Sequence, residues 1–267
     1  MTNWDEIDVF AKEWIKAAGS LIKESFSKEL VITTKSNKND LVTEIDRNTE
    51  KFFIDKIRET YPDHKILGEE GLGDTISSLE GIVWIIDPID GTMNFVHMQR
   101  NFAISIGIFE NGIGKVGLVY DVVHDELYHA KKGQGAFLNE LELEPLQTAT
   151  VSEGILGLNP TWIIENKRID HNMLVPLVKD VRGTRNYGSA ALEIAYVAAG
   201  RLDAYISPRL SPWDYGGGKV LVEELGGIAT DLKGKPLDLL STTTVFISKP
   251  GLHGEVMSQY LQNGNWS

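Results

Sequence analysis

The chain has 267 residues, enough for a full hydrophobic core and for two packed subdomains. Its net charge is −12 and no block of Lys or Arg offsets that charge, so we expect no nucleic-acid or anionic-membrane partner. Cysteine is absent, which excludes disulfides, thiolate catalysis and Cys-ligated zinc or iron–sulfur sites. No apolar run approaches membrane-spanning length and the first residues lack a signal-peptide pattern, so we expect a cytoplasmic protein.

The N-terminal half predicts two helices followed by a β-rich region. Apolar residues at three- and four-residue steps predict amphipathic helices over 4–26 and 43–60. Between them we expect a strand over 30–34 and a polar loop over 35–40. Further strands are predicted at 66–69, 83–87, 102–109, 113–120 and 126–130, with a hairpin turn at Asn111-Gly112.

The C-terminal half predicts alternating strands and helices. The expected strands are 151–158, 181–187, 202–206 and 245–248, and the expected helices are 171–180, 189–199, 214–225 and 252–261. The polar stretch 139–150 is the best candidate boundary, which gives subdomains 1–144 and 145–267. Both halves therefore predict α/β organisation.

One stretch carries the strongest chemical signal. A short apolar run from Val83 ends in Asp87-Pro88-Ile89-Asp90-Gly91-Thr92, which is typical of a buried strand that runs into a functional loop. Because Pro88 restricts its own backbone and that of Asp87, we expect a sharp turn there. Asp87 and Asp90 would then face one another with the Ile89 carbonyl between them, a set of hard oxygen ligands that suits Mg²⁺. The alternative is an ordinary capped turn.

Four other places hold acids or small residues of interest. Glu69 ends a strand shortly before the Asp87 turn and could supply a third carboxylate. Asp46, in the first turn of a helix, is by position alone a charge favoured by the helix dipole. Asp214 is expected to be the N-cap of its helix, and the glycines 216–218 after it suggest close approach of another backbone or of a ligand. The helix start at 188–190 suits an oxyanion or hydroxyl ligand.

Taken together, three blocks resemble the inositol monophosphatase family of Mg²⁺-dependent, lithium-sensitive sugar phosphatases. The blocks are Gly68-Glu69-Glu70, the stretch 87–92, and Trp213-Asp214 followed by glycines. The resemblance extends over nearly the whole chain. It implies a layered αβαβα sandwich with a mostly antiparallel N-terminal sheet and a mixed C-terminal sheet, usually as a homodimer. It also implies hydrolysis of a small phosphate monoester, such as inositol monophosphate, by a metal-activated water.

The resemblance also implies a role for each matching residue. The ligands of two or three Mg²⁺ ions, for which Mn²⁺ or Ca²⁺ could substitute, would be Glu69, Asp87, the Ile89 carbonyl, Asp90 and Asp214. The catalytic residues would be Glu69, Asp90, Thr92 and Asp46. Of these, Thr92 would polarise the attacking water and Asp46 would hydrogen-bond Thr92. This role replaces the dipole interpretation of Asp46. The substrate would meet the amides of Gly91 and Thr92 at its phosphate, and Gly188, Ser189, Ala190, Ser207 and Asp214 along its polyol.

One departure from the family pattern leaves the substrate open. Inositol-specific members place a Glu seven residues before the Trp-Asp aspartate, whereas this chain has Ser207 there, followed by Pro208 and Arg209. A smaller side chain leaves room for a larger or more anionic substrate, and Arg209 could meet a second phosphate or simply be a solvated charge. Activity on NADP, fructose 1,6-bisphosphate or 3′-phosphoadenosine 5′-phosphate is therefore an alternative.

Three rival classes remain open on the residues. A haloacid-dehalogenase-like phosphatase would use Asp87 as a nucleophile, but its motif has one residue fewer between the two acids. A carboxylate-pair glycosidase would need two acids and no metal. A non-catalytic sugar-phosphate-binding protein could keep the same scaffold.

Overall fold

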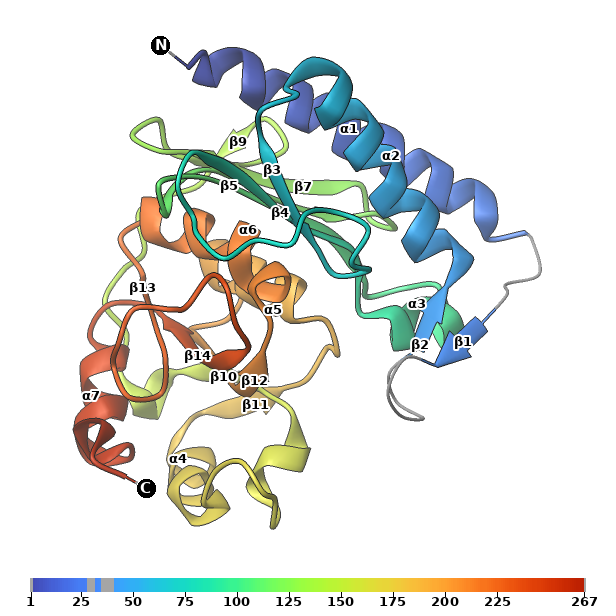
Figure 1. Ribbon diagram of the computed structural model, residues 1–267. Coiled ribbons are helices and arrows are strands. Elements are labelled where there is room, and N and C mark those ends of the chain that lie inside the picture. The colour runs from blue at the N-terminus through green and yellow to red at the C-terminus, as the bar shows by residue number, and fades with distance from the viewer. Residues whose placement is uncertain (1, 28–31, 35–40, 267) are drawn as a thin grey trace.

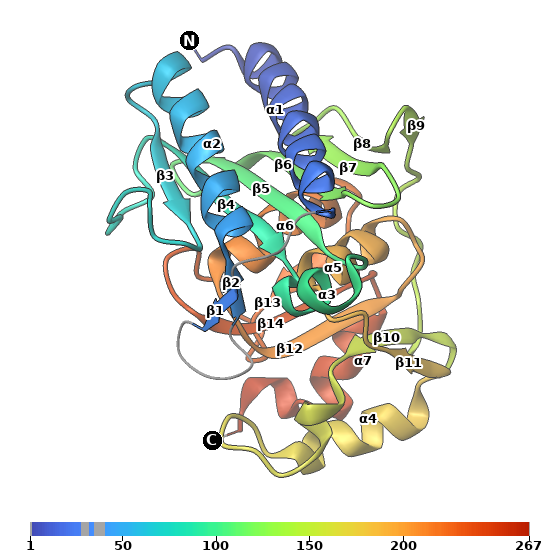
Figure 2. The same ribbon diagram turned by 90° about the vertical axis from the view of Figure 1, so that its right-hand side faces the viewer.

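The computed structural model describes residues 2–27, 32–34 and 41–266, which form five stacked layers (Figure 1). The outer layer consists of α1 (Trp4–Ser25) and α2 (Glu44–Thr60), which lie side by side over the first sheet in both views (Figure 2). The central helical layer is α5 (Ala190–Ala198) and α6 (Pro212–Glu224), and α4 (Leu174–Asp180) and α7 (Leu252–Gln259) lie beyond the second sheet. The expected αβαβα sandwich is therefore confirmed.

The first sheet has seven strands in the order β3-β4-β5-β6-β7-β8-β9. Their bounds are β3 Lys65–Gly68, β4 Ile82–Asp90, β5 Ala103–Glu110, β6 Ile113–Asp121, β7 Glu126–Lys131, β8 Ala136–Leu138 and β9 Leu141–Glu142. Only β3 and β4 pair in parallel, so the sheet is mostly antiparallel as expected. The hairpin at Asn111-Gly112 is confirmed: both residues have positive φ, as a type I′ turn requires.

The second sheet has five strands in the order β11-β10-β12-β14-β13. Their bounds are β10 Ile155–Leu158, β11 Gly183–Arg185, β12 Ala204–Leu210, β13 Ile228–Thr230 and β14 Thr243–Ser248. β10 pairs in parallel with β11 and β12, whereas β14 pairs antiparallel with β12 and β13, so the sheet is mixed as expected. In the chain, residue 145 falls between the last strand of the first sheet and the first strand of the second. Helix α6, which follows residue 145 in the chain, nevertheless packs on the first sheet. The division into subdomains 1–144 and 145–267 stays a prediction.

Two smaller elements and four 3-10 turns complete the described chain. A two-stranded antiparallel pair, β1 (Ile32–Thr34) and β2 (Leu41–Thr43), precedes α2, and α3 (Thr92–Met98) follows β4. The 3-10 turns are Val151–Glu153, Pro160–Ile163, His171–Met173 and Gln262–Gly264. Residues 30–31 of the predicted first strand and the predicted loop 35–40 lie outside the described residues.

Several predicted bounds in the second half are wrong. The segment predicted as a strand over 151–158 begins as a 3-10 turn, because the Val151 N–H donates to the Glu255 side chain of α7 (2.8 Å) and leaves the sheet direction. The strand predicted over 181–187 shrinks to β11, and the one predicted over 202–206 shifts to β12. The helix predicted over 171–180 is a 3-10 turn followed by α4.

The strand β4 begins as a continuous apolar run because both of its faces are buried. Side chains alternate between faces along a strand, so Val83 and Ile85 pack toward α5 and α6, whereas Trp84 and Ile86 pack toward α1 and α2. All four are fully buried because helices cover both faces of the sheet.

The glycines 216–218 allow α6 to lie directly on the sheet. A Cβ at Gly217 would stand 2.5 Å from the Leu118 carbonyl oxygen, and one at Gly117 would stand 2.4 Å from the Gly217 carbonyl oxygen. Backbone therefore packs on backbone here, which decides between the two alternatives for these glycines. The close approach brings the first turn of α6, with Asp214, to the end of β4.

Candidate metal and active site

The end of β4 is a β-bulge and not the sharp turn expected at Pro88. Asp87 pairs with Ser105 and Asp90 with Ala103, so two residues of β4 face one residue of β5. The missing N–H of Pro88 costs no ladder bond in a bulge. The Asp87 carboxylate accepts the Ile89 N–H (3.0 Å), which closes the bulge locally. The bulge places both acids at the same end of the strand.

Three carboxylates converge at this bulge. One oxygen from each of Asp87, Asp90 and Asp214 lies within 4.8 Å of the other two. Asp87 and Asp90 are 1% and 8% exposed, and Asp214 is half-buried. No ion pair joins these three to a Lys or Arg among residues 2–27, 32–34 and 41–266. The described part of the site is thus a concentration of buried negative charge.

Glu69 adjoins this cluster from the neighbouring strand. Gly68 pairs with Ile86 in the parallel ladder, and the Glu69 N–H donates to the Ile86 carbonyl (3.2 Å), so Glu69 stands beside Asp87. Burial raises the pKa of Asp87 well above its usual range, and the charges of Glu69, Asp90 and Asp214 raise this pKa further. Burial also raises the pKa of Asp90 to about 7, against the lowering effect of its hydrogen bonds.

Asp214 belongs to the first turn of α6, but it is not the N-cap that the sequence predicted. The N-cap is Ser211, whose backbone N–H donates to the Asp214 carboxylate (2.7 Å) in a capping box. Burial and then the Asp90 charge raise the pKa of Asp214, whereas the charge of Arg209 lowers it. The same side chain therefore caps a helix and lies in the carboxylate cluster.

Asp46 and Thr92 lie together beside the cluster. The Asp46 carboxylate accepts the hydroxyl and the N–H of Thr43 (2.6 and 2.9 Å), which fixes the start of α2. Its other oxygen lies 3.1 Å from the Thr92 hydroxyl, and the Ile89 carbonyl lies 3.1 Å from the same hydroxyl. Because the Thr92 hydroxyl has one proton, it can donate to only one of these two acceptors at a time.

The predicted substrate-side residues 188–190 lie against Asp90. Ser189, the N-cap of α5, donates its hydroxyl to Asp90, and the Ala191 N–H donates to the same oxygen (2.7 Å). Gly91 has φ +93°, and a Cβ there would stand 3.2 Å from the Ser189 Cβ, so the loop and the bulge touch. Gly188 and Ala190 flank this contact.

Ser207 lies at an irregularity in β12. The pairing register with β14 shifts between Ser207 and Leu210, and the Ser207 hydroxyl donates to the Arg209 carbonyl (3.1 Å). Its side chain is 4% exposed. The Ser207 hydroxyl therefore stabilises the irregular end of its own strand.

Three residues that hold these loops were not predicted from the sequence. Glu50 of α2 accepts the N–H groups of Glu70 and Leu72 (2.7 and 2.8 Å), behind Glu69. On the other side, Asn94 of α3 and Glu193 of α5 hold the segment at 187–188. Gly68 was the available signal for Glu50, since a Cβ there would lie 2.4 Å from the Glu50 side chain.

The donor set fits a divalent cation with oxygen ligands. Buried carboxylates whose pKa values are raised by one another are costly to ionise, and a cation removes that cost. Carboxylates and a backbone carbonyl are the ligands that Mg²⁺ and Ca²⁺ accept, whereas softer metals prefer the imidazole and thiolate groups that this cluster lacks.

Comparison with known proteins decides the family. The model of the "Inositol monophosphatase family" matches residues 3–264. The chain belongs to the inositol monophosphatase family. It is 63% identical over 261 residues to the inositol-1-monophosphatase of Bacillus subtilis (strain 168), covering 98% of each chain.

Solved structures of this family share the fold. SaIMPase-II of Staphylococcus aureus is known with inositol monophosphate (44% identity, TM-score 0.87, 96% of this chain and 94% of that one) and with 2′AMP (45% identity, TM-score 0.89, 96% of this chain and 95% of that one). An IMPase/NADP phosphatase complexed with Mg²⁺ and phosphate is 28% identical with TM-score 0.89, over 99% and 97% of the two chains. Family members are metal-dependent phosphatases, and the carboxylate cluster fits that chemistry. Among the described residues no helix is long and apolar enough to cross a membrane.

Proposed function

We propose that this protein is a Mg²⁺-dependent phosphate monoester hydrolase acting on inositol monophosphate or a related phosphorylated polyol. The observation that carries the proposal is the convergence of Asp87, Asp90 and Asp214 within 4.8 Å, with none of the three ion-paired to a Lys or Arg among the described residues. Such a cluster suits a site whose function requires cations and an anionic substrate together.

In this proposal Glu69, Asp87, the Ile89 carbonyl, Asp90 and Asp214 hold the metal. When bound, Mg²⁺ supplies an activated water and offsets the charge of the phosphate dianion. Glu69 directly follows β3, and the other ligands lie in β4 and α6, so the packing of these three elements fixes their relative positions. The layered fold is therefore the frame of the metal site.

The Thr92–Asp46 pair orients the attacking water. When the Thr92 hydroxyl donates to Asp46, which lies 3.1 Å away, the threonine oxygen can accept a hydrogen bond from the water. The amides of Gly91 and Thr92 bind the phosphate, and Gly188, Ser189 and Ala190 lie along the polyol, with Ser207 behind it. Asp214 contributes to both the metal and the substrate side.

A second candidate substrate is a nucleoside 2′-phosphate. Two observations favour it: the small Ser207 stands where inositol-specific members have a glutamate, and SaIMPase-II is known with 2′AMP. Arg209 also lies near enough to Asp214 for its charge to lower the pKa of that carboxyl, against the larger effect of burial. A cation on this wall favours a substrate with additional negative charge.

We further propose two or three Mg²⁺ ions per site, inhibition by lithium, a homodimer and a cytoplasmic location. A LiCl-soaked inhibitory complex of staphylococcal inositol monophosphatase-1 supports the lithium proposal. The exposed side chains of Met93 and Met98 on α3 support self-association. The cytoplasmic location rests on composition.

A substrate panel tests the proposed function. Phosphate release is measured in Mg²⁺ with inositol 1-phosphate, 2′-AMP, NADP, fructose 1,6-bisphosphate and 3′-phosphoadenosine 5′-phosphate. We expect inositol 1-phosphate to be hydrolysed, and comparable kcat/KM for 2′-AMP would establish the second candidate. Hydrolysis of none of the five compounds would contradict the proposal.

A further inference from the structure

Glu193 is a buried acid that the proposed mechanism does not use. It lies in the first turn of α5 and is 2% exposed. One carboxylate oxygen accepts the N–H groups of Tyr187 and Gly188 (2.8 and 3.2 Å). The other oxygen has no hydrogen-bond partner in the described part of the chain, and a Cβ at Gly157 would stand only 2.7 Å from it.

The retention of this carboxylate is costly to the fold. Burial raises the pKa of Glu193 to about 7, although the two backbone N–H bonds lower it. A buried polar oxygen without a hydrogen-bond partner also destabilises the fold, because it has lost its bonds to water. A side chain selected for stability alone would not leave an orphan oxygen here, so the two N–H groups that Glu193 holds deserve a functional explanation.

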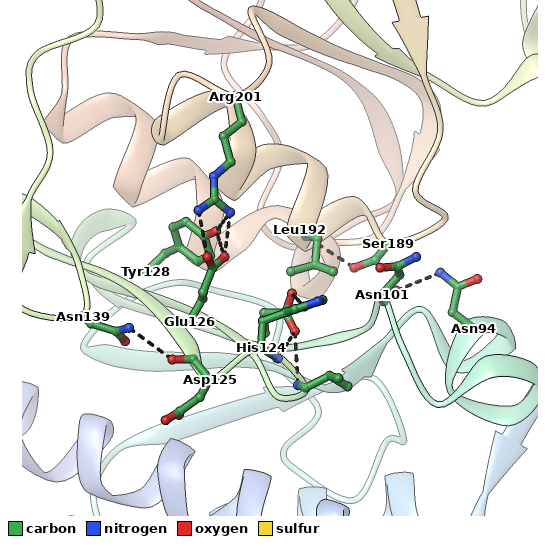
Figure 3. Close-up of polar contacts among 12 residues, drawn as sticks. Asn94, Asn101, His124, Asp125, Glu126, Tyr128, Asn139, Ser189, Leu192 and Arg201 are labelled. Carbon is green, nitrogen blue, oxygen red and sulfur yellow. Dashed lines mark hydrogen bonds and ion pairs between the residues drawn. The ribbon is translucent and has the colours of Figure 1, made fainter.

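Asn94 holds the same segment from the opposite direction. Its side-chain amide donates to the Asn101 carbonyl oxygen at 2.7 Å (Figure 3). The same amide donates to the Tyr187 carbonyl oxygen, also at 2.7 Å. Gly188 has φ +76°, and a Cβ there would stand 3.0 Å from the Asn94 amide nitrogen. The Tyr187–Gly188 segment is thus hydrogen-bonded on two sides. Glu193 of α5 accepts its two N–H groups, and Asn94 of α3 donates to the Tyr187 carbonyl.

The Tyr187–Gly188 segment directly precedes a residue of the candidate site. The next residue, Ser189, donates its hydroxyl to Asp90. The same hydroxyl oxygen accepts the Leu192 N–H (3.3 Å) and so caps α5 (Figure 3). A shift of Tyr187 and Gly188 would therefore move Ser189 against Asp90 and move the wall along which the polyol is proposed to lie.

We propose that Glu193 is a positioning residue that, with Asn94, fixes the substrate-side wall at 187–190. The expected effect on KM rests on the proposed function, whereas the expected effect on the mobility of the segment rests on the geometry alone. Glu193 touches neither the carboxylate cluster nor the expected substrate; it acts through the backbone of Tyr187 and Gly188.

The chain offers a matched control for this device. Glu224 of α6 also accepts two backbone N–H groups of one loop, those of Gly133 and Gly135 (3.0 and 2.9 Å), but at the β7–β8 turn. The experiment compares Glu193→Leu, which lacks an acceptor, Glu193→Gln, which keeps one acceptor oxygen, and Glu224→Leu. KM and kcat are measured with inositol 1-phosphate in saturating Mg²⁺, and amide hydrogen exchange is followed over 186–191.

For Glu193→Leu we expect KM to rise about 10-fold or more, a larger change than that in kcat, because wall contacts bind the polyol. Exchange over 186–191 should be faster. Glu193→Gln and Glu224→Leu should both stay within about 3-fold of the wild-type KM. A purely structural role would lower the melting temperature of Glu193→Leu and leave KM unchanged.

The proposal is overturned if Glu193→Leu leaves exchange over 186–191 at the wild-type rate, or if its KM changes no more than that of Glu224→Leu. Absence of turnover in the wild type would instead reject the proposed function. In that case the exchange comparison still decides whether Glu193 positions the segment, so the two failures are distinguishable.

Discussion

Asp87 serves both the backbone and the site. Its carboxylate accepts the Ile89 N–H and closes the bulge, and the same group lies in the cluster with Asp90 and Asp214. Like charges brought together in a buried position destabilise the ionised forms. The native protein without metal therefore retains three acids at a cost, in return for a cation site.

An Asp87→Asn substitution separates these two effects. The asparagine oxygen can still accept the Ile89 N–H, so we expect the fold to persist. kcat/KM should fall about 10³-fold, the upper range for loss of one electrostatic group at a reacting centre. In EDTA the melting temperature should rise, because one buried repulsive charge is gone.

Thermal unfolding in EDTA and phosphate release in Mg²⁺ check this prediction. A variant that loses activity and also melts lower in EDTA would show that Asp87 is needed for the fold itself. Retained activity would remove Asp87 from the metal ligands.

At the residue scale the sequence predicted the acids better than the residues that hold them. Asp87, Asp90, Glu69 and Asp214 stand in compact motifs, so pattern alone singles them out. Glu50, Asn94 and Glu193 occupy unremarkable helix positions, and each meets its loop only through the tertiary fold. The sequence predicts Asp214 alone as the N-cap, whereas Ser211 is the N-cap and forms a capping box with Asp214.

At the scale of elements, α6 sets the distance between the two halves of the site. Its glycines lie against β5 and β6, where a Cβ at Gly217 would stand 2.5 Å from the Leu118 carbonyl oxygen and 2.9 Å from that of Ile106. Backbone atoms cannot give way as side chains do, so α6 would have to lift from the sheet to admit a methyl group.

We predict that Gly217→Ala destabilises the protein by about 1–3 kcal/mol, the usual range for overpacking. The matched control is Gly254→Ala in α7, where a Cβ would meet no atom within 4 Å. That control should be neutral or stabilising by up to about 1 kcal/mol, because alanine favours a helix over glycine. Denaturant unfolding of both variants provides the measurement, and equal stabilities for the two would refute the close packing.

The long elements were predictable and the short ones were not. Periodicity over many residues identified α1, α2 and the hairpin strands β5 and β6 close to their observed bounds. The 3-10 turn at Val151–Glu153 and the extension of β12 past Pro208 depend on partners elsewhere in the chain, namely Glu255 and β14. Local propensity cannot report such partners.

At the scale of the whole molecule, the site lies where the layers meet. In the first sheet, β4 supplies Asp87 and Asp90, and Glu69 directly follows β3. The central layer supplies Asp214, and α2 supplies Asp46. The resemblance of three sequence blocks to the family implies that these acids converge. The packing of the helices between the sheets explains why they do.

This concentration of acids predicts how metal and pH act on stability. Burial and mutual repulsion raise the pKa of Asp87 and Asp214, and that of Asp90 to about 7, above the values in the unfolded chain. Between pH of about 4 and 7 the native protein then binds more protons than the unfolded one, so its stability falls as pH rises. Mg²⁺ binds the ionised carboxylates, so its stabilising effect grows over the same range.

Melting temperatures at pH 5 to 8, in EDTA and in Mg²⁺, measure this linkage. We expect the gain in melting temperature on adding Mg²⁺ to increase with pH, and to be smaller at every pH in Asp87→Asn. A gain that is constant with pH, or unaffected by the substitution, would disconnect the metal from these carboxylates.

The most direct test of the account is phosphate release from inositol 1-phosphate by the wild type and by Asp90→Asn, each in Mg²⁺ and in excess EDTA. The control is Asp203→Asn, which changes an aspartate that accepts the Ile155 N–H (2.7 Å) at the second sheet. We predict Mg²⁺-dependent release by the wild type and the control, a loss of about 10²–10³-fold in Asp90→Asn, and no release in EDTA. Activity that persists in EDTA, or an Asp90→Asn variant as active as the wild type, would contradict a metal-dependent hydrolase built on this carboxylate cluster.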